Sequence, residues 1–264
     1  MLTLYHHGSS VCAAKVRLVL HDKDAKWEGE YLDILKGEQF TPEYTAINPN
    51  AVVPTLIDDG AIIIESTVIC EYLDEKFAAP SLQPETPLDR AAMRLWTKRV
   101  DEKLHPMTSV LTYVCSHRHS ILEGNSPEQV EKIINETSDP VKRARKREWI
   151  ELGLDAPSAR VAVKEFAHTL ADMEQILSDQ NWLAGDTYSL ADVALTPYLN
   201  RLRMLQMAGF WENLPAVSDW FDRVRARPSF EPAVISWIPE PLSAGMARNG
   251  ERSWPKVRDM LANI

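Results

Sequence analysis

The residues best suited to chemistry are concentrated in one segment, NPNAVVPTLIDDGAIIIES, at positions 48–66. Pro54 heads an apolar, β-branched run, where a proline cannot donate to a sheet ladder. A cis peptide bond before this proline would turn the backbone N–H and C=O of the preceding residue toward a ligand. Glu65 and Ser66 open a helical pattern, and the free amides at a helix N-terminus favour a carboxylate. The segment therefore predicts a site for an extended peptide with a charged end.

The same segment also has a purely structural interpretation. Pro54 can be a trans proline at a strand edge, and Ser66 can simply cap the helix that follows. These residues alone leave the two interpretations evenly balanced, so the decision rests on the rest of the chain.

The elements expected to position this segment form an α/β unit with a small mixed sheet. Asp-Asp-Gly at 58–60 separates two apolar runs and predicts a tight hairpin. A helical crossover would make the first two strands parallel, and Pro42 is placed to start a helical turn. We expect strands at 2–5, 27–32, 52–57 and 61–64, and helices at 11–23 and 66–77.

After this unit the sequence becomes helical. Prolines at 80, 84 and 87 mark a linker, so we predict a first domain at 1–78, a linker at 79–88 and an all-α second domain at 89–264. Apolar residues recur at helical spacing over 89–104, 110–120, 159–177, 190–207 and 218–226, and Ser126-Pro127-Glu128 starts a further helix. The tail from Pro228 to Ile264 has a poor helical pattern before Val257.

The composition argues against several classes of protein, namely nucleic-acid-binding, membrane-associated and secreted proteins. The chain has 264 residues, 45% hydrophobic residues and a formal charge of −9, which argues against nucleic acid or an anionic membrane surface as a partner. No apolar run approaches the roughly 20 residues that span a bilayer. Strand pattern begins directly after Met1, which leaves no room for a signal peptide. Three cysteines are too few for a disulfide framework and indicate a reducing, cytoplasmic location.

Several polar groups have structural explanations. Ser189 and Asp192 have the spacing of a capping box. His117 and His119 lie two residues apart on a predicted helix and face different directions, so no metal site is expected. The basic run at 142–147 is typical of a solvated helix face; a weaker alternative is that it attracts an anionic substrate.

Five motifs, in this order, resemble the cytosolic glutathione transferases: LYHHGSSVCAAKVRLVL at 4–20, GEQFTPEYTAINPNAVVPTLIDDG at 37–60, ES at 65–66, EYLDEKF at 71–77 and WLAGDTYSLADVAL at 182–195. The resemblance covers nearly the whole chain. It implies a thioredoxin-like first domain that binds glutathione as co-substrate and a helical second domain that supplies most of the second-substrate pocket. It also implies a homodimer.

The resemblance assigns the glutathione-binding residues by position. Val53, before Pro54, would pair its main chain with the glutathione cysteine. Glu65 and Ser66 would hold the γ-glutamyl end, and Gln39 would lie near the glycyl carboxylate. Ala51 departs from the glycine that the family usually has nearby, and Val52 replaces a residue that is often basic or polar.

The resemblance places the activating hydroxyl at Ser10. This hydroxyl would donate to the glutathione sulfur and favour the thiolate at the first helix N-terminus, where the helix dipole adds about 0.3–1 kcal/mol. Ser10 can also be an ordinary helix cap. Ser9 is an alternative activator, and Cys12 is an alternative through thiol–disulfide chemistry, although a small buried helix residue is the better interpretation of Cys12.

A narrower resemblance concerns the second substrate. STVICEYL at 66–73, RAAMRLWTKRVDE at 90–102 and the charged segment 126–158 are similar to the glutathione-dependent β-aryl etherases of lignin-degrading bacteria. Alternatives are a maleylacetoacetate isomerase-like enzyme, a dehalogenase, or a non-catalytic binding protein of the same fold. We expect a small hydrophobic or aromatic electrophile in a pocket lined by Met107, Leu111, Tyr113 and part of the tail after Pro228.

Overall fold

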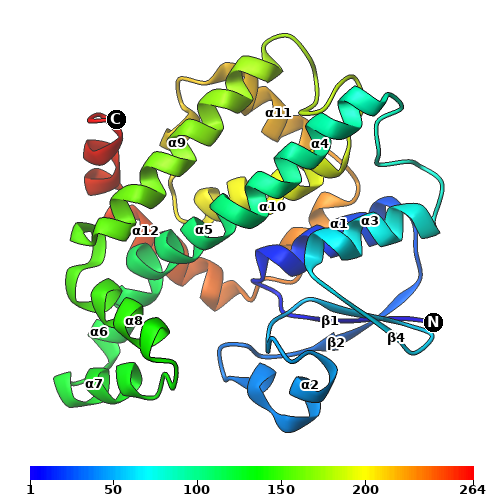
Figure 1. Ribbon diagram of the computed structural model, residues 1–264. Helices are drawn as coiled ribbons and strands as arrows, with labels where there is room; N and C mark the ends of the chain where they lie inside the picture. Colours follow the sequence, from blue (N-terminus) through cyan, green and yellow to red (C-terminus); the bar gives the residue numbers. More distant parts are fainter. The chain divides into compact units, whose positions relative to one another are not determined.

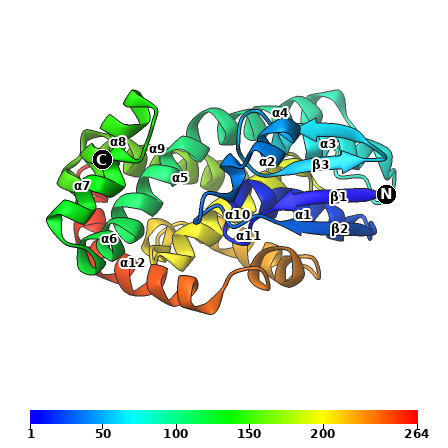
Figure 2. The ribbon, with the colours of Figure 1, turned by 90° about the horizontal axis from the view of Figure 1, so that it is seen from below.

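A computed structural model describes residues 1–264, and its N-terminal part is a four-stranded sheet with strand order β2-β1-β3-β4. β1 (Leu2–His6) pairs in parallel with β2 (Trp27–Tyr31), and β3 (Thr55–Asp58) pairs antiparallel with both β1 and β4 (Ala61–Ile64). Figure 2 shows β1 between β2 and β3. The predicted parallel pair and the predicted hairpin are both confirmed.

Two helices cover one side of this sheet. α1 (Val11–Asp22) and α3 (Ser66–Lys76) pack against each other there, while α2 (Pro42–Ile47) lies on the other side (Figure 1). Leu4 and Leu56 from the central strands and Val16, Leu20 and Ile69 from the helices are fully buried. The apolar residues of the strands and helices thus recur at the positions that face the core, because burial of such side chains is the main stabilising term in folding.

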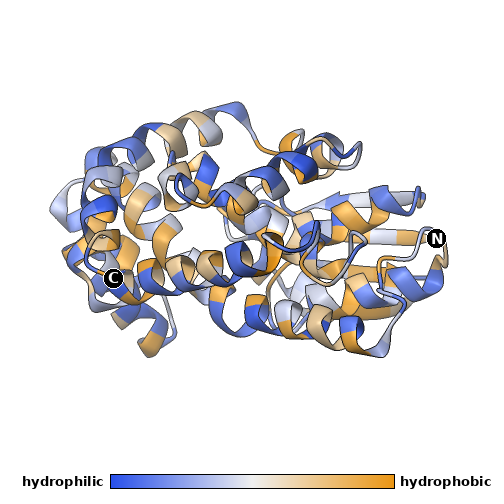
Figure 3. Cartoon of the chain, turned by 90° about the horizontal axis from the view of Figure 1, so that it is seen from above, coloured by the Kyte–Doolittle hydropathy of each residue, from blue (hydrophilic) through white to orange (hydrophobic).

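The chain packs as two compact units, and each unit is built from three separate segments of the sequence. The first consists of Met1–Lys98, Leu177–Pro197 and Asp219–Pro239, and the second of Arg99–Ile176, Tyr198–Ser218 and Glu240–Ile264. The linker expected at 79–88 stays a prediction. In both units the helices carry polar and apolar residues on different faces (Figure 3), as expected for helices that bury one stripe.

A buried carboxylate joins the later segments of the first unit. Asp192, in α10 (Leu190–Met204), accepts hydrogen bonds from the backbone N–H of Leu183 at 3.1 Å, the backbone N–H of Ser189 at 2.9 Å and the indole N–H of Trp220 at 2.8 Å. The bond to Ser189 is the return half of the predicted capping box. Burial raises the pKa of Asp192 to about 6.

The second unit is helical throughout, as the sequence predicts. α7 starts at the predicted Pro127, with a complete capping box between Ser126 and Gln129.

None of the helices in the chain combines the length and the apolar character that a membrane span requires. The helices wholly or mostly in the second unit are α5 (His105–Thr112), α6 (Arg118–Gly124), α7 (Pro127–Asn135), α8 (Pro140–Leu152), α9 (Pro157–Leu177) and α12 (Glu240–Leu261). The end of α10 and the start of α11 (Pro215–Arg225) also belong to it. The π-helical turn η2 (Val100–Leu104) precedes α5, and η3 (Tyr113–His117) joins α5 to α6.

The sequence predicts an irregular tail, and this prediction is wrong for α12, which is a helix of 22 residues. Its buried face consists of Met246, Asn249, Gly250, Ser253 and Val257. These positions have helical spacing, but most of them are small or polar, so the apolar pattern is weak. A side chain at Gly250 would meet the carbonyl oxygen of Leu205 at 2.0 Å, so this glycine permits a close approach of two backbones.

Ala51, before β3, adopts a left-handed backbone conformation with φ of +52°. This is the position where the resemblance places a glycine. The conformation costs an L-residue about 1–2 kcal/mol, whereas glycine adopts it freely. The alanine is therefore held in place by the surrounding structure at some cost in stability.

We predict that Ala51→Gly raises the free energy of unfolding by about 0.5–1 kcal/mol, because relief of the backbone strain exceeds the added entropy of the unfolded chain. Urea unfolding monitored by fluorescence measures the change. Ala46→Gly, inside α2, is the matched control and should lower stability by about 0.5–1 kcal/mol. A destabilising effect of both glycines would contradict the assignment of strain to Ala51.

Candidate functional site

Ser10 ends the loop after β1 and is the N-cap of α1. Its Oγ accepts a hydrogen bond from the backbone N–H of Ala13 at 3.2 Å, and its hydroxyl hydrogen has no acceptor in the structure. The first turn of α1 contains no acidic residue, so no carboxylate within that turn offsets the positive end of the helix dipole. A sulfur placed beside Ser10 would receive a hydrogen bond and a field that favours its thiolate form.

Ser9, by contrast, is engaged with His7 in the same loop. The backbone N–H of Ser9 donates to Nδ1 of His7 at 3.2 Å, and the Oγ of Ser9 lies 3.1 Å from the same nitrogen. Because Nδ1 accepts from this amide, we assign the hydrogen of the neutral ring to Nε2, which lies 3.9 Å from Oδ1 of Asp33. The Oγ of Ser9 is thus engaged with the His7 ring, whereas the hydroxyl hydrogen of Ser10 has no acceptor, so Ser10 is the better donor to a sulfur.

Cys12 is the second residue of α1 and is half-buried. The chain contains no disulfide, and the other two cysteines, Cys70 and Cys115, are buried. Burial raises the pKa of the Cys115 thiol to about 12, so Cys115 stays protonated and unreactive near neutral pH. Among the three thiols, that of Cys12 is the one that solvent reaches, and it lies two positions beyond Ser10.

Arg17 holds this loop from inside the first unit. It is fully buried and has no carboxylate partner. Its guanidinium donates to the backbone carbonyls of His7 and Gly8, each at 3.2 Å, and to that of Ala233 at 2.7 Å. Burial lowers the pKa of Arg17 to about 9, so the side chain is still a cation at neutral pH. Three carbonyl dipoles thus replace the water that a buried cation loses.

The segment after α11 lies directly against this loop. A side chain at Gly8 would meet the carbonyl oxygen of Trp237 at 1.9 Å, so glycine is required for this close approach. The Trp237 ring packs edge-on against His6, with 4.5 Å between ring centroids, and Arg17 lies 5.6 Å from its centre. Burial, together with the nearby charge of Arg17, lowers the pKa of His6 to about 4. The early part of the tail therefore supports the loop.

The backbone before β3 offers unused hydrogen-bonding groups. The Val53–Pro54 peptide bond is cis, as the first interpretation of this segment required. The N–H and C=O of Val53 form no hydrogen bond within the chain. An extended peptide can therefore pair with Val53 as a further strand would, because both of its ladder groups are available.

A polar network fixes the position of this backbone. The carbonyl oxygen of Val52 accepts from the hydroxyl of Tyr44 at 2.6 Å and from the side-chain amide of Asn48 at 3.0 Å. Both side chains also reach Oγ1 of Thr55, at 2.8 and 2.9 Å. Since Tyr44, Asn48 and Thr55 are buried, these bonds are shielded from competing water. The turn signal at 48–50 thus supplies a side chain that orients the residues before β3.

The start of α3 differs from the expected cap. Glu65, not Ser66, is the N-cap, and its side chain forms no capping hydrogen bond. Its φ of +68° is unusual for a residue other than glycine, and such strain is often found at ligand sites. Ser66 is 7% exposed, and its hydroxyl forms no hydrogen bond. The first amides of an 11-residue helix and one hydroxyl are thus available to a carboxylate.

Gln39 lies in a short 3-10 turn, η1 (Glu38–Phe40). Its side-chain nitrogen donates to the carbonyl oxygen of Ile34 at 3.4 Å, while its side-chain oxygen is buried without a partner. The amide has a second hydrogen to donate. A role beside the glycyl carboxylate stays a prediction.

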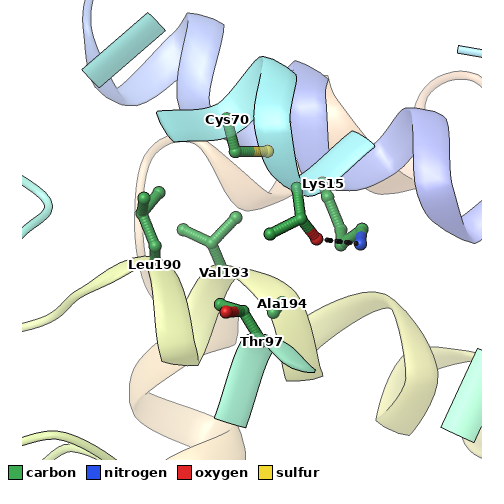
Figure 4. A pocket seen from close by; sticks show the side chains of 7 residues that line it. Lys15, Cys70, Thr97, Leu190, Val193 and Ala194 are labelled. Carbon is green, nitrogen blue, oxygen red and sulfur yellow. Dashed lines mark hydrogen bonds between the residues drawn. The ribbon is translucent and has the colours of Figure 1, made fainter. Parts of the chain in front are cut away.

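A small pocket lies behind the N-terminal part of α3, between this helix, α1 and α10 (Figure 4). Lys15 donates to Oγ1 of Thr67 at 3.1 Å at its edge. The pocket has a volume of about 10 Å³, and a single water needs about 10–15 Å³ measured in this way. It is therefore too small for a substrate.

The three residues expected in the second-substrate pocket do not share one surface. Met107 is half-buried and lines a cleft beside α5, whereas Leu111, one turn further along, is 1% exposed and belongs to the core. The Tyr113 ring packs against Trp149 in a tilted arrangement with 5.2 Å between ring centroids, and its hydroxyl is buried without a partner. Burial raises the pKa of Tyr113 to about 12. All three residues belong to the second unit.

Comparisons with known proteins agree with this arrangement. Residues 4–81 match the model of the glutathione S-transferase N-terminal domain, and residues 141–228 match that of its C-terminal domain. Protein LigF of Sphingobium sp. strain SYK-6 is 32% identical over 87% of this chain and 91% of its own length. The chain belongs to the glutathione S-transferase family. Members of this family use glutathione as co-substrate.

The proteins similar to this glutathione S-transferase are named for different reactions. The crystal structure of the beta-etherase LigF has a TM-score of 0.75 at 30% identity and covers 88% of this chain and 98% of LigF. A maleylacetoacetate isomerase of Pseudomonas aeruginosa is 29% identical over 88% of this chain and 95% of its own length. A tetrachloro-p-hydroquinone reductive dehalogenase of Sphingobium chlorophenolicum is 27% identical over 89% and 96%. The expected thioredoxin-like and helical domains are confirmed.

We predict that Ser66→Ala weakens glutathione binding, because a hydrogen bond to a charged group contributes about 1.5–3 kcal/mol. Isothermal titration calorimetry measures the affinity. Ser81→Ala removes an exposed hydroxyl of the same unit and is the control, for which no change is expected. Equal affinities for wild type and Ser66→Ala would show that the γ-glutamyl carboxylate lies elsewhere.

Proposed function

We propose that this chain is a glutathione transferase in which Ser10 activates the thiol. Glutathione would lie extended along the N–H and C=O of Val53, with its γ-glutamyl carboxylate at Ser66 and the first amides of α3. The observation that carries the proposal is the hydroxyl hydrogen of Ser10, which has no acceptor and lies at a helix N-terminus. Ser9, whose Oγ lies 3.1 Å from Nδ1 of His7, would help to set the conformation of the loop.

The proposed chemistry is displacement at an electrophilic carbon. The hydrogen bond from Ser10 and the dipole of α1 would lower the pKa of the glutathione thiol, so that more thiolate is present at neutral pH. The thiolate sulfur forms a bond to carbon, and the leaving group departs with the bonding electron pair. Ser10 supplies a hydrogen bond and keeps its own proton throughout.

For the second substrate we propose a β-aryl ether next to a ketone. The support is the similarity to the beta-etherase LigF, which extends over most of both chains in sequence and in structure. In this reaction the sulfur attacks the carbon next to the ketone, the carbon–oxygen bond breaks, and a phenoxide leaves. The products would be a glutathione thioether and a phenol, once the phenoxide takes a proton from solvent.

Isomerase or dehalogenase chemistry is the second candidate. The maleylacetoacetate isomerase and the reductive dehalogenase match this chain at only slightly lower identity. Cys12 is relevant to a reductive reaction, because a thiol close to the reacting sulfur can resolve a mixed disulfide. A non-catalytic binding protein would have no need for a serine whose hydroxyl hydrogen is left without an acceptor.

For the assembly we propose a cytoplasmic homodimer with twofold symmetry, the commonest form of homo-oligomer. α4 (Pro87–Arg99) carries exposed charged side chains, Arg94 among them, beside a buried stripe. Such a helix suits a position at an interface. Light scattering should give twice the 29.9 kDa of one chain, and a monomer would refute this assembly.

A panel of electrophiles tests the second substrate. We predict glutathione-dependent release of a phenol from a β-aryl ether ketone, with formation of the thioether measured by mass spectrometry. The other members of the panel are a chloronitroaromatic, maleylacetoacetate and tetrachlorohydroquinone. Turnover of one of the last two without the ether would favour the second candidate, and no turnover of any compound would indicate a binding protein.

A further inference from the structure

Tyr31, the last residue of β2, carries a hydroxyl that the rest of the chain leaves unused. In the register of the parallel strand pair, Tyr31 lies opposite His6, the last residue of β1. Tyr31 is 45% exposed, and its hydroxyl forms no hydrogen bond in the structure. A phenol hydroxyl can both donate and accept a hydrogen bond, so this group is available to a ligand.

The hydroxyl of Tyr31 lies beside the loop that carries Ser10. A side chain at Gly8 would meet the hydroxyl oxygen of Tyr31 at 3.6 Å, so this oxygen is close to the backbone two residues before Ser10. β2 and β1 are neighbouring strands (Figure 2). Beyond their ladder, the backbone N–H of Leu32 donates to the carbonyl oxygen of His6 at 2.9 Å. The end of β2 is therefore held next to the start of the loop.

The Tyr31 ring is fixed by two buried histidines. Its centroid lies 5.8 Å from that of His6, in an edge-on arrangement, and 5.3 Å from that of His7, in a tilted one. Aromatic pairs at such distances attract each other. A phenylalanine could make the same two ring contacts, so the hydroxyl itself has no part in holding β2 to the loop.

Two cations act on the place where this hydroxyl lies. Burial lowers the pKa of Arg17 to about 9, and the charge of the nearby Tyr31 oxygen partly offsets this lowering. Asp33 raises the pKa of Lys36, and the Tyr31 oxygen adds a smaller rise. Because Lys36 is paired with Asp33 at 3.0 Å, Arg17 is the main source of positive potential. An oxygen that gains negative charge beside Tyr31 would therefore be stabilised.

The other side-chain donors of the loop are engaged elsewhere. Oγ of Ser9 lies 3.1 Å from Nδ1 of His7, and Nε2 of His7 faces Asp33 at 3.9 Å. Ser10 is the proposed donor to the glutathione sulfur. In a displacement the leaving group departs on the side of the carbon opposite to the incoming sulfur, so its donor must be a group other than Ser10. Tyr31, on a different element, meets this requirement.

We propose that Tyr31 is a further catalytic residue, whose hydroxyl donates a hydrogen bond to the oxygen that leaves the β-aryl ether. As the sulfur–carbon bond forms and the carbon–oxygen bond breaks, the leaving oxygen takes the bonding electron pair and gains negative charge. A donor placed where charge develops lowers the barrier. Tyr31 keeps its own proton, and the phenoxide takes a proton from solvent. The inference rests on the proposed function, because it assigns a role in the same reaction.

Two β-aryl ether ketones that differ only in their leaving phenol test the proposal. One releases 4-nitrophenol, an acidic phenol, and the other releases 4-methoxyphenol, whose phenoxide is more basic and needs more stabilisation. Single-turnover rates with saturating glutathione report the chemical step. Tyr31→Phe should slow release of 4-methoxyphenol about tenfold, as expected for the loss of one hydrogen bond to a group that gains charge. Release of 4-nitrophenol should slow by less than about threefold, because its phenoxide depends less on a donor.

Two further readouts separate this role from a structural one. Tyr31→Phe should leave the midpoint of thermal unfolding unchanged, because the hydroxyl has no partner in the chain. It should also leave the pKa of the bound glutathione thiol unchanged, because Ser10 is the donor to the sulfur. Tyr5→Phe is the matched control. It removes the same atom from β1, next to His6 and on the opposite face of the sheet, and should alter neither rate.

The possible results are distinguishable. An equal loss of rate with both ethers in Tyr31→Phe, or no loss with either, would overturn the role of Tyr31 and leave the proposed function intact. A raised pKa of the bound thiol would show that the hydroxyl acts on the sulfur, which also contradicts the inference. If the wild type releases neither phenol, the proposed function is wrong and this inference is wrong with it.

Discussion

The loop between β1 and α1 depends on one buried cation. Arg17 has no carboxylate to neutralise it, so its charge is stabilised by the carbonyl oxygens of His7, Gly8 and Ala233. Removal of the guanidinium would leave all three carbonyls without this donor, and a buried group that loses its partner costs about 1–3 kcal/mol. The same side chain thereby fixes the loop that carries Ser9 and Ser10 and the segment that carries Trp237.

Because Arg17 fixes the loop, the loop can hold the Ser10 hydroxyl in place although its hydrogen has no acceptor. Most buried or half-buried polar groups in folded proteins find partners, and Ser9 does so through His7. Ser10, Val53 and Ser66 instead retain hydrogen-bonding groups with no partner in the chain. They come from the N-termini of two helices and the backbone before β3, all within the first unit. Unused groups on rigid elements are what a preorganised ligand site requires.

The sequence was sufficient for the sheet, the hairpin and most helices, because apolar periodicity and the turn residues at 58–60 agree with the final structure. It failed for α12, whose buried face includes Asn249, Gly250 and Ser253 and therefore lacks an apolar pattern. It also failed for the helix cap at Ser66, since a strained N-cap at Glu65 has no sequence signal. Arg17 was missed as well, although an arginine between Val16 and Leu18 in an apolar helix was a usable signal.

The central claim is that Ser10 stabilises the thiolate of bound glutathione, and titration of that thiolate by its ultraviolet absorbance tests it most directly. The account predicts that Ser10→Ala raises the pKa of the bound thiol by about 1–2 units, since one unit corresponds to about 1.4 kcal/mol and a hydrogen bond to a charged group contributes about 1.5–3 kcal/mol. Ser9→Ala and Cys12→Ala should leave that pKa close to the wild-type value. An unchanged pKa in Ser10→Ala, or a rise in Ser9→Ala alone, would contradict the account.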